Sequence, residues 1–258
     1  MKFKIGIFDS GIGGFTILKA LLKTRNDVEV IYLADTMRIP YGNKNSSQIR
    51  YIAKEICNWF ADKKLDALLI ACNTTNACAL DILESKLNIP CFDLINSVSE
   101  VINQKTIGIL ATPTTVKSSY YEKVISAQRK NLKIIQQGCP EFVSEIEKNK
   151  LDIKKINFLS DLYLSSLLKE NIEVLILGCS HYPLIYNIIR EKLDKNINII
   201  DPSAALIEKF NKFFSTPKIS SNKALSYDNV SFFVTAGNEQ FSQKVKFWLE
   251  INKEIRLV

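Results

Sequence analysis

Two cysteines in this sequence stand where a thiol can take part in acid/base chemistry. Cys72 follows the apolar run at residues 67–71, Cys179 follows the run at 174–178, and a polar turn follows each. A helix N-terminus and a nearby imidazolium both favour the thiolate form of a cysteine. His181, the only histidine, is therefore expected to act as a general acid or as a thiolate partner. The alternative is that both cysteines are small buried apolar residues and that His181 is a hydrogen-bonded turn residue.

The remaining cysteines are expected to be structural, because they fall in predicted helices, a short strand and a Gly-Cys-Pro turn: Cys57, Cys78, Cys91 and Cys139. A single histidine and the absence of a second Cys/His motif exclude a tetrahedral metal site. Six cysteines among 258 residues are too few for a disulfide framework. We therefore expect a reduced, cytoplasmic protein.

Further polar turns follow other predicted strands, at residues 9–14, 35–42 and 112–115. In open α/β sheets, ligands bind beyond the carboxyl ends of the strands. The sequence Asp-Ser-Gly-Ile-Gly-Gly at 9–14 resembles a phosphate loop, but it begins with a carboxylate that repels phosphate. Its glycines are better explained by a tight turn and the close approach of a small ligand.

Composition excludes several classes of protein. The apolar fraction of 47% is that of a globular chain, and no apolar run approaches the ~18 residues of a membrane span. The N-terminus enters a strand pattern directly, without the pattern of a signal peptide. The net charge of +7 comes from scattered basic residues, of which only 6 of 34 are Arg. We interpret this as a solubilising surface and expect neither a nucleic acid nor a membrane as partner.

Apolar runs of strand length alternate with segments of helical periodicity, which predicts an α/β fold with parallel sheets. The predicted strands are 3–8, 28–34, 67–71, 90–92, 106–111, 132–136, 174–177, 198–200, 230–235 and 254–258. The predicted helices are 16–23, 47–63, 75–87, 116–127, 152–170, 184–193, 204–214 and 240–249.

A weak internal repeat divides the chain. Residues 5–8 resemble residues 107–110, and residues 67–72 resemble residues 174–179 with a cysteine at the same position. Both matches keep their order, as two related α/β units would.

Seven segments together resemble the cofactor-independent glutamate racemases, a two-cysteine family of aspartate and glutamate racemases. In order they are IGIFDSGIGG, ADTMRIPYGNK, LLIACNTTNA, GILATPTTVKSSYY, GCPEFVSEIE, LILGCSHYPLI and IIDPSAAL. The resemblance extends from residue 1 to about residue 210. It implies two pseudosymmetric α/β domains, formed by residues 1–95 with 206–258 and by residues 96–205, with the active site between them. It also implies an isomerase that interconverts L- and D-glutamate for peptidoglycan synthesis, without pyridoxal phosphate or metal, as a homodimer.

The resemblance assigns Cys72 and Cys179 as the two catalytic acid/base residues. Asp9 would assist Cys72, while Glu147 and His181 would assist Cys179. The substrate-binding residues carried over are Asp9, Ser10, Tyr41, Gly42, Asn73, Thr74, Thr115, Ser180 and His181.

Three positions depart from the family pattern. Ser180 stands where the family usually has Thr, Ser144 replaces a Pro, and Thr114 replaces an Ala. Glu145 lies close enough to Glu147 in the sequence to be an alternative assisting carboxylate. Two alternative functions are an aspartate or other two-cysteine racemase, and a two-lobed protein that binds an acidic amino acid without turnover.

Overall fold

Two parallel sheets form the centre of the molecule, in a computed structural model that describes residues 2–215 and 225–258. The strand order is β10-β9-β2-β1-β3-β4 in the first sheet and β6-β5-β7-β8 in the second. The strands are β1 (Phe3–Asp9), β2 (Val28–Ala34), β3 (Ala67–Ile70), β4 (Cys91–Asp93), β5 (Thr106–Ala111), β6 (Lys133–Gly138), β7 (Val174–Gly178), β8 (Asn198–Ile200), β9 (Val230–Val234) and β10 (Ile255–Leu257).

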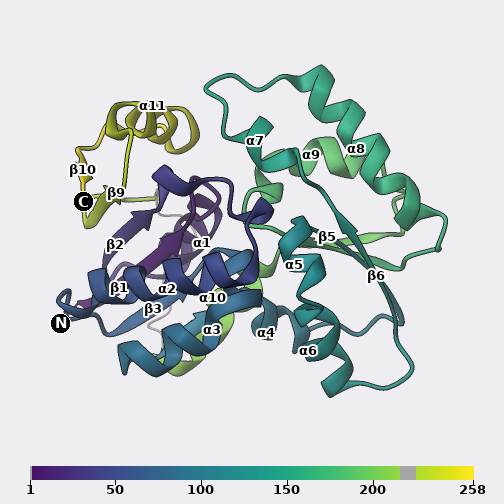
Figure 1. The fold of residues 1–258 in the computed structure, drawn as a ribbon, viewed down its shortest axis with the longest axis horizontal. Coiled ribbons are helices and arrows are strands. Elements are labelled where there is room, and N and C mark those ends of the chain that lie inside the picture. Colours follow the sequence, from purple (N-terminus) through teal and green to yellow (C-terminus); the bar gives the residue numbers. More distant parts are fainter. Residues whose placement is uncertain (1, 216–224) are drawn as a thin grey trace.

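Helices connect the strands and cover the sheets (Figure 1). They are α1 (Phe15–Thr24), α2 (Ser46–Ala61), α3 (Asn73–Leu87), α4 (Leu94–Ser99), α5 (Pro113–Lys117), α6 (Tyr120–Gln128), α7 (Phe142–Ile146), α8 (Ile153–Leu168), α9 (Tyr186–Glu191), α10 (Pro202–Phe213) and α11 (Asn238–Leu249). Short 3₁₀ turns lie at Thr36–Arg38, Tyr41–Asn43 and Tyr182–Ile185.

Local sequence explains where many helices begin. Asn45 and Gln48 form a reciprocal capping box at the start of α2, with each side chain bonded to the other's backbone N–H. The Asp93 side chain caps α4, and Asp201 caps α10, where Pro202 occupies the first turn. These caps satisfy backbone N–H groups that would otherwise lack partners.

The central strands are continuous apolar runs because both faces of each sheet are covered. On one face of the first sheet, Phe8 packs in a cluster with Phe60 of α2. On the other face, Phe15 of α1 packs with Tyr32 and with Phe241 of α11. Burial on both faces is the usual situation of a parallel sheet.

All ten predicted strands are present, with ends within about two residues of the prediction. The single helix predicted at 116–127 is wrong: it is two helices, α5 and α6, separated at Ser119, whose φ of 53° lies in the left-handed region. Helices α4 and α7 are also absent from the prediction, because they are too short to show a helical period. In the described part of the chain, no helix has both the length and the apolar character needed to cross a bilayer.

The predicted internal repeat has a structural counterpart. The order β2-β1-β3-β4 in the first sheet matches the order β6-β5-β7-β8 in the second. The matched sequence segments lie on β1 and β5 and on β3 and β7. The two pseudosymmetric α/β units expected from the sequence are therefore confirmed.

Candidate active site

The carboxyl ends of four central strands carry the polar residues singled out from the sequence. β1 lies between β2 and β3, and β5 lies between β6 and β7, so each sheet has a switch point at which successive connections diverge. Asp9 ends β1 and Cys72 follows β3; Thr112 follows β5 and Cys179 follows β7. The two units thus present equivalent ends, each with one cysteine.

Cys72 is buried at the start of α3, where only 4% of its surface is exposed. Burial, together with the nearby charge of Asp9, raises the pKa of the Cys72 thiol to about 12. Hydrogen bonding from Thr75 favours the thiolate and limits this rise. Cys72 is consequently a neutral thiol at physiological pH.

Asn73, the residue after Cys72, has a fixed orientation and an unused donor. Its Oδ1 accepts a hydrogen bond of 2.7 Å from the Tyr121 hydroxyl, which links α3 to α6 of the second unit. Its buried Nδ2 has no hydrogen-bond partner among the described residues. The buried Thr75 hydroxyl also has no hydrogen-bond partner among the described residues. It donates to the Cys72 sulfur when that sulfur carries negative charge. Buried donors of this kind are suited to binding an anionic ligand.

Cys179 is equally buried, at 5% exposure, but it has different neighbours. Its sulfur lies 3.9 Å from Nδ1 of His181. Nε2 of His181 lies 2.7 Å from Oε1 of Glu147, and that oxygen also accepts the Ile12 N–H at 2.9 Å. Glu145 instead forms ion pairs with lysines, so Glu147 is the carboxylate in contact with the histidine.

The His181–Glu147 contact has a clear electrostatic effect. Burial by itself disfavours the charged imidazole, but hydrogen bonds with Cys179 and Glu147 raise the pKa of His181 well above its usual value. Burial also disfavours the Glu147 carboxylate, yet His181 and Lys244 lower the pKa of Glu147 to about 2. The two groups therefore form a buried ion pair beside Cys179.

The glycine loop after β1 brings the two units into contact. Oδ2 of Asp9 accepts the N–H groups of Gly11 and Gly14, at 3.2 and 3.0 Å, and Oδ1 accepts the Ser180 hydroxyl at 3.1 Å. A Cβ at Gly13 would lie 2.3 Å from Oγ of Ser180, so only glycine permits this approach. The loop is thus bound to its own aspartate and to the second unit.

Three threonine hydroxyls form a buried cluster across the same junction. Oγ1 of Thr112 lies 3.0 Å from that of Thr74 and 2.9 Å from that of Thr115. The Thr114 hydroxyl donates to the Gly42 carbonyl oxygen at 2.8 Å. Thr74 and Thr115, both predicted from the sequence, therefore lie together, and Thr112 joins them.

The other predicted substrate-binding residues also lie at this junction or beside it. Ser10 is buried next to Asp9 in the glycine loop. The Tyr41 hydroxyl donates to the buried Asp35 carboxylate, which also accepts the Thr235 hydroxyl at 2.8 Å. Tyr41 is thereby fixed by its own unit.

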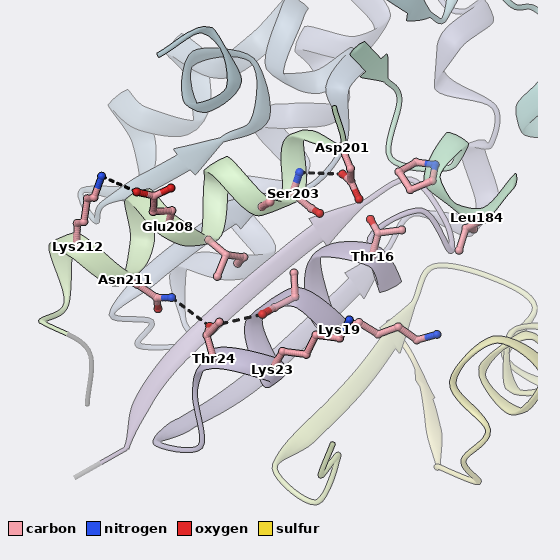
Figure 2. A pocket seen from close by; sticks show the side chains of 14 residues that line it. Thr16, Lys19, Lys23, Thr24, Leu184, Asp201, Ser203, Glu208, Asn211 and Lys212 are labelled. Atoms are coloured by element: carbon pink, nitrogen blue, oxygen red, sulfur yellow. Dashed lines mark hydrogen bonds and ion pairs between the residues drawn. The ribbon is translucent and has the colours of Figure 1, made fainter. Parts of the chain in front are cut away.

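Within residues 2–215 and 225–258, no three His, Cys, Asp or Glu side chains are grouped so that they could hold a metal ion. A cavity of about 840 Å³ lies between α1, α10 and the turn Tyr182–Ile185, lined in part by Lys19, Leu184 and Ser203 (Figure 2). Its lining includes neither Cys72 nor Cys179, so it is separate from the junction described above.

Comparison with known proteins identifies the family. The family model described as Asp/Glu/Hydantoin racemase matches residues 16–210. A glutamate racemase of Prochlorococcus marinus (strain NATL2A) is 45% identical over 255 residues, covering 99% of this chain and 96% of the relative. The chain belongs to the Asp/Glu/hydantoin racemase family. The family resemblance predicted from the sequence motifs is therefore confirmed.

Solved structures of the same family extend the match to the whole fold. A glutamate racemase of Bacillus anthracis superposes with a TM-score of 0.89 at 27% identity, covering 99% of this chain and 97% of that chain. A glutamate racemase of Francisella tularensis in complex with D-glutamate has a TM-score of 0.88 at 32% identity, covering 100% and 97%. The racemase fold thus extends beyond residue 210 to α11.

Several polar groups of the site were not predicted from the sequence. Thr75 and Thr112 could have been found as additional hydroxyls of the polar turns already identified. Tyr121 and Lys244 carried no such signal, because each reaches the site from a helix distant in the sequence.

Proposed function

We propose that this protein is a glutamate racemase that interconverts L- and D-glutamate and supplies D-glutamate for peptidoglycan synthesis. The observation that carries the proposal is the pair of buried thiols, Cys72 and Cys179, at equivalent strand ends of two units in contact. Glutamate is favoured over aspartate because relatives named for glutamate match nearly the whole chain.

Racemisation requires two bases on opposite faces of Cα. One sulfur, as thiolate, takes the Cα proton, and the other, as thiol, delivers its own proton to the opposite face, so charge and protons balance. Burial and Asp9 keep Cys72 protonated, which makes it the donor in the free enzyme. The other sulfur, Cys179, which lies 3.9 Å from Nδ1 of His181, is then the acceptor.

The carbanion formed at Cα must be stabilised by groups already in position. The unused Asn73 Nδ2 and the Thr75 hydroxyl are buried donors beside Cys72. They and the backbone N–H groups at the start of α3 can bind a carboxylate and the negative charge that develops in the transition state. We propose that these donors take the place of a pyridoxal phosphate or metal cofactor.

The remaining predicted residues hold the substrate in this proposal. Ser10 and Asp9 act from the loop after β1, and Ser180 acts from the second unit, where its hydroxyl contacts Asp9. Thr74 and Thr115 supply hydroxyls from both units, and Tyr41 with Gly42 forms a further wall of the site. Because both thiols are buried, the two units must separate to admit glutamate and then close over it.

Four further expectations are part of the proposal. We divide the chain into residues 1–95 with 206–258 and residues 96–205, a division that agrees with the strands of the two sheets and cuts α4 and α10. We place the protein in the cytoplasm, because the reaction needs free thiols and all six cysteines are unpaired. We also expect the protein to form a homodimer and to have neither a nucleic acid nor a membrane as partner.

The test is racemisation in D₂O, followed by circular dichroism, starting from pure L- or pure D-glutamate. We expect both to reach the racemate with solvent deuterium at Cα. Cys72→Ser and Cys179→Ser should each abolish racemisation, while each retains exchange or elimination on one face with a modified substrate. Cys91→Ser, a change outside the site, is the matched control and should remain active.

Each alternative function has its own outcome in this experiment. Turnover of aspartate in preference to glutamate would indicate another two-cysteine racemase. Binding of glutamate without exchange at Cα would indicate a binding protein. Full activity in alanine variants of both cysteines would refute the two-thiol mechanism.

A further inference from the structure

A lysine of the C-terminal helix reaches the acid/base groups beside Cys179. Nζ of Lys244 lies 2.6 Å from Oε2 of Glu147, and the lysine side chain is 16% exposed. Lys244 belongs to α11, which lies outside residues 16–210, the part matched by the family model. Figure 1 shows α11 facing the segment that contains α7, the helix just before Glu147.

The contact places Lys244 at the end of a series of buried polar groups. Oε2 of Glu147 is bound to Lys244, while Oε1 is shared between His181 and the Ile12 N–H. His181 in turn presents Nδ1 to the sulfur of Cys179. Three segments distant in the sequence therefore meet at one carboxylate.

We propose that Lys244 is a positioning residue for the Cys179 side of the reaction. By holding one oxygen of Glu147, it directs the other toward His181, and it limits how firmly that histidine keeps its proton. The inference rests on the proposed roles of Cys179 and His181. It assigns a function to α11, which is otherwise only the cover of the first sheet.

The charges around His181 determine whether removal of Lys244 raises or lowers the pKa of this histidine. Cys179 and Glu147 favour the protonated imidazole, and the buried Asp9 carboxylate also interacts with His181. Lys244 is the cation that faces Glu147 from α11 and offsets part of its charge. Without this cation, the full carboxylate charge acts on His181, which must then hold its proton more firmly.

Tyr32 also lies near Glu147, but it does not compete with Lys244. Burial raises the pKa of Tyr32 well above its usual value, and its hydroxyl donates to the Gly11 carbonyl at 2.7 Å. Tyr32 is therefore neutral throughout the range in which the enzyme would be measured.

The chain offers a clean probe, because His181 is its only histidine. We would label histidine with ¹³C in the full-length protein and titrate the imidazole signal by NMR in wild type, Lys244→Met, Lys244→Arg and Lys246→Met. Methionine keeps most of the lysine stem without the charge, and arginine restores a cation. Lys246 lies on the same helix and is exposed, so it controls for changes to α11.

We expect Lys244→Met to raise the pKa of His181 by about one unit, a tenfold gain in proton affinity. It should lower kcat roughly tenfold, with a smaller change in KM, and shift the alkaline limb of the pH profile upward. Lys244→Arg should restore most of the wild-type His181 pKa and most of the wild-type kcat. Lys246→Met should resemble wild type.

An unchanged His181 titration in Lys244→Met would overturn the inference, even if activity falls, because the lysine would then be only structural. Equal effects of Lys244→Met and Lys246→Met, or no rescue by arginine, would overturn it as well. Failure of the proposed function is distinct: wild type would show no exchange at Cα, whereas the titration would still report the coupling of Lys244 to His181.

Discussion

Replacing Gly13 with alanine should lower the rate of catalysis while leaving the stability of the fold nearly unchanged. Gly13 lies in the loop after β1, directly against Ser180 and His181 of the second unit. An alanine Cβ would stand 2.3 Å from Oγ of Ser180 and 2.6 Å from Nδ1 of His181. The backbone of Gly13 does not have a positive φ, so alanine causes no backbone strain of its own.

The size of the effect follows from these distances. Ordinary contacts of a Cβ begin at about 3.4 Å, so the loop and Ser180 must move apart by about 1 Å, and such a displacement of reacting groups costs about 100-fold in rate. Because the clash falls on the polar side chains of Ser180 and His181, we expect little change in the thermal midpoint. Because L- and D-glutamate have equal free energy, kcat/KM must fall by the same factor in both directions.

The assay is circular dichroism of both enantiomers, with thermal unfolding of the same samples. Gly138→Ala is the matched control, since its Cβ would meet Pro113 at an ordinary 3.5 Å. If the activity of Gly13→Ala stays within threefold of wild type, catalysis does not require the close approach of the two units, and the reasoning is refuted. An equal loss in Gly138→Ala would show that the effect is not specific to this contact.

Three further changes test individual contacts. Glu147→Gln should destabilise the protein at neutral pH by roughly 3 kcal/mol. This difference should disappear as the pH falls from 4.5 to about 2, because the carboxylate of Glu147 is protonated in that range and its stabilising charge is lost. Urea unfolding of both proteins at several pH values measures the difference. Asp9→Asn should lower the pKa of Cys72, because it removes a nearby anion. Thiolate absorbance, compared between Asp9→Asn and the double variant that also carries Cys72→Ser, would detect this shift. Tyr121→Phe should raise KM more than it lowers kcat, because the Asn73 amide loses the bond that orients it; steady-state kinetics in both directions would show this.

Much of the fold could be predicted from the sequence because its signals are local. Strand β5, for example, is an apolar run bounded by polar residues, and its observed limits equal the predicted ones. The break at Ser119 could not be predicted, since helical periodicity continues through it and only the left-handed conformation of one residue divides the helix. Helix α4 has six residues, too few for a periodic pattern, although Asp93 is a recognisable cap.

The site was predictable to the extent that topology determines it. Parallel strands place their carboxyl ends at one edge, so Cys72 and Cys179 could be expected at such edges. Contacts between the units, such as Thr74 with Thr112, depend on how the units pack, and no local pattern encodes that packing. The loop after β1 shows why its aspartate disfavours phosphate: the carboxylate already occupies the N–H groups of Gly11 and Gly14.

The duplicated fold supplies two equivalent sulfur positions, but the side chains around them differ. Burial and the Asp9 carboxylate raise the pKa of the Cys72 thiol, which keeps its proton in place. Cys179 instead faces the His181–Glu147 ion pair. In the proposed mechanism, Cys179 gains the Cα proton and Cys72 gives up its own, so the enzyme emerges in the opposite protonation state. It must then return through proton exchange at the two sulfurs or accept the other enantiomer. The values of kcat for L- and D-glutamate are therefore free to differ, although their kcat/KM values are not.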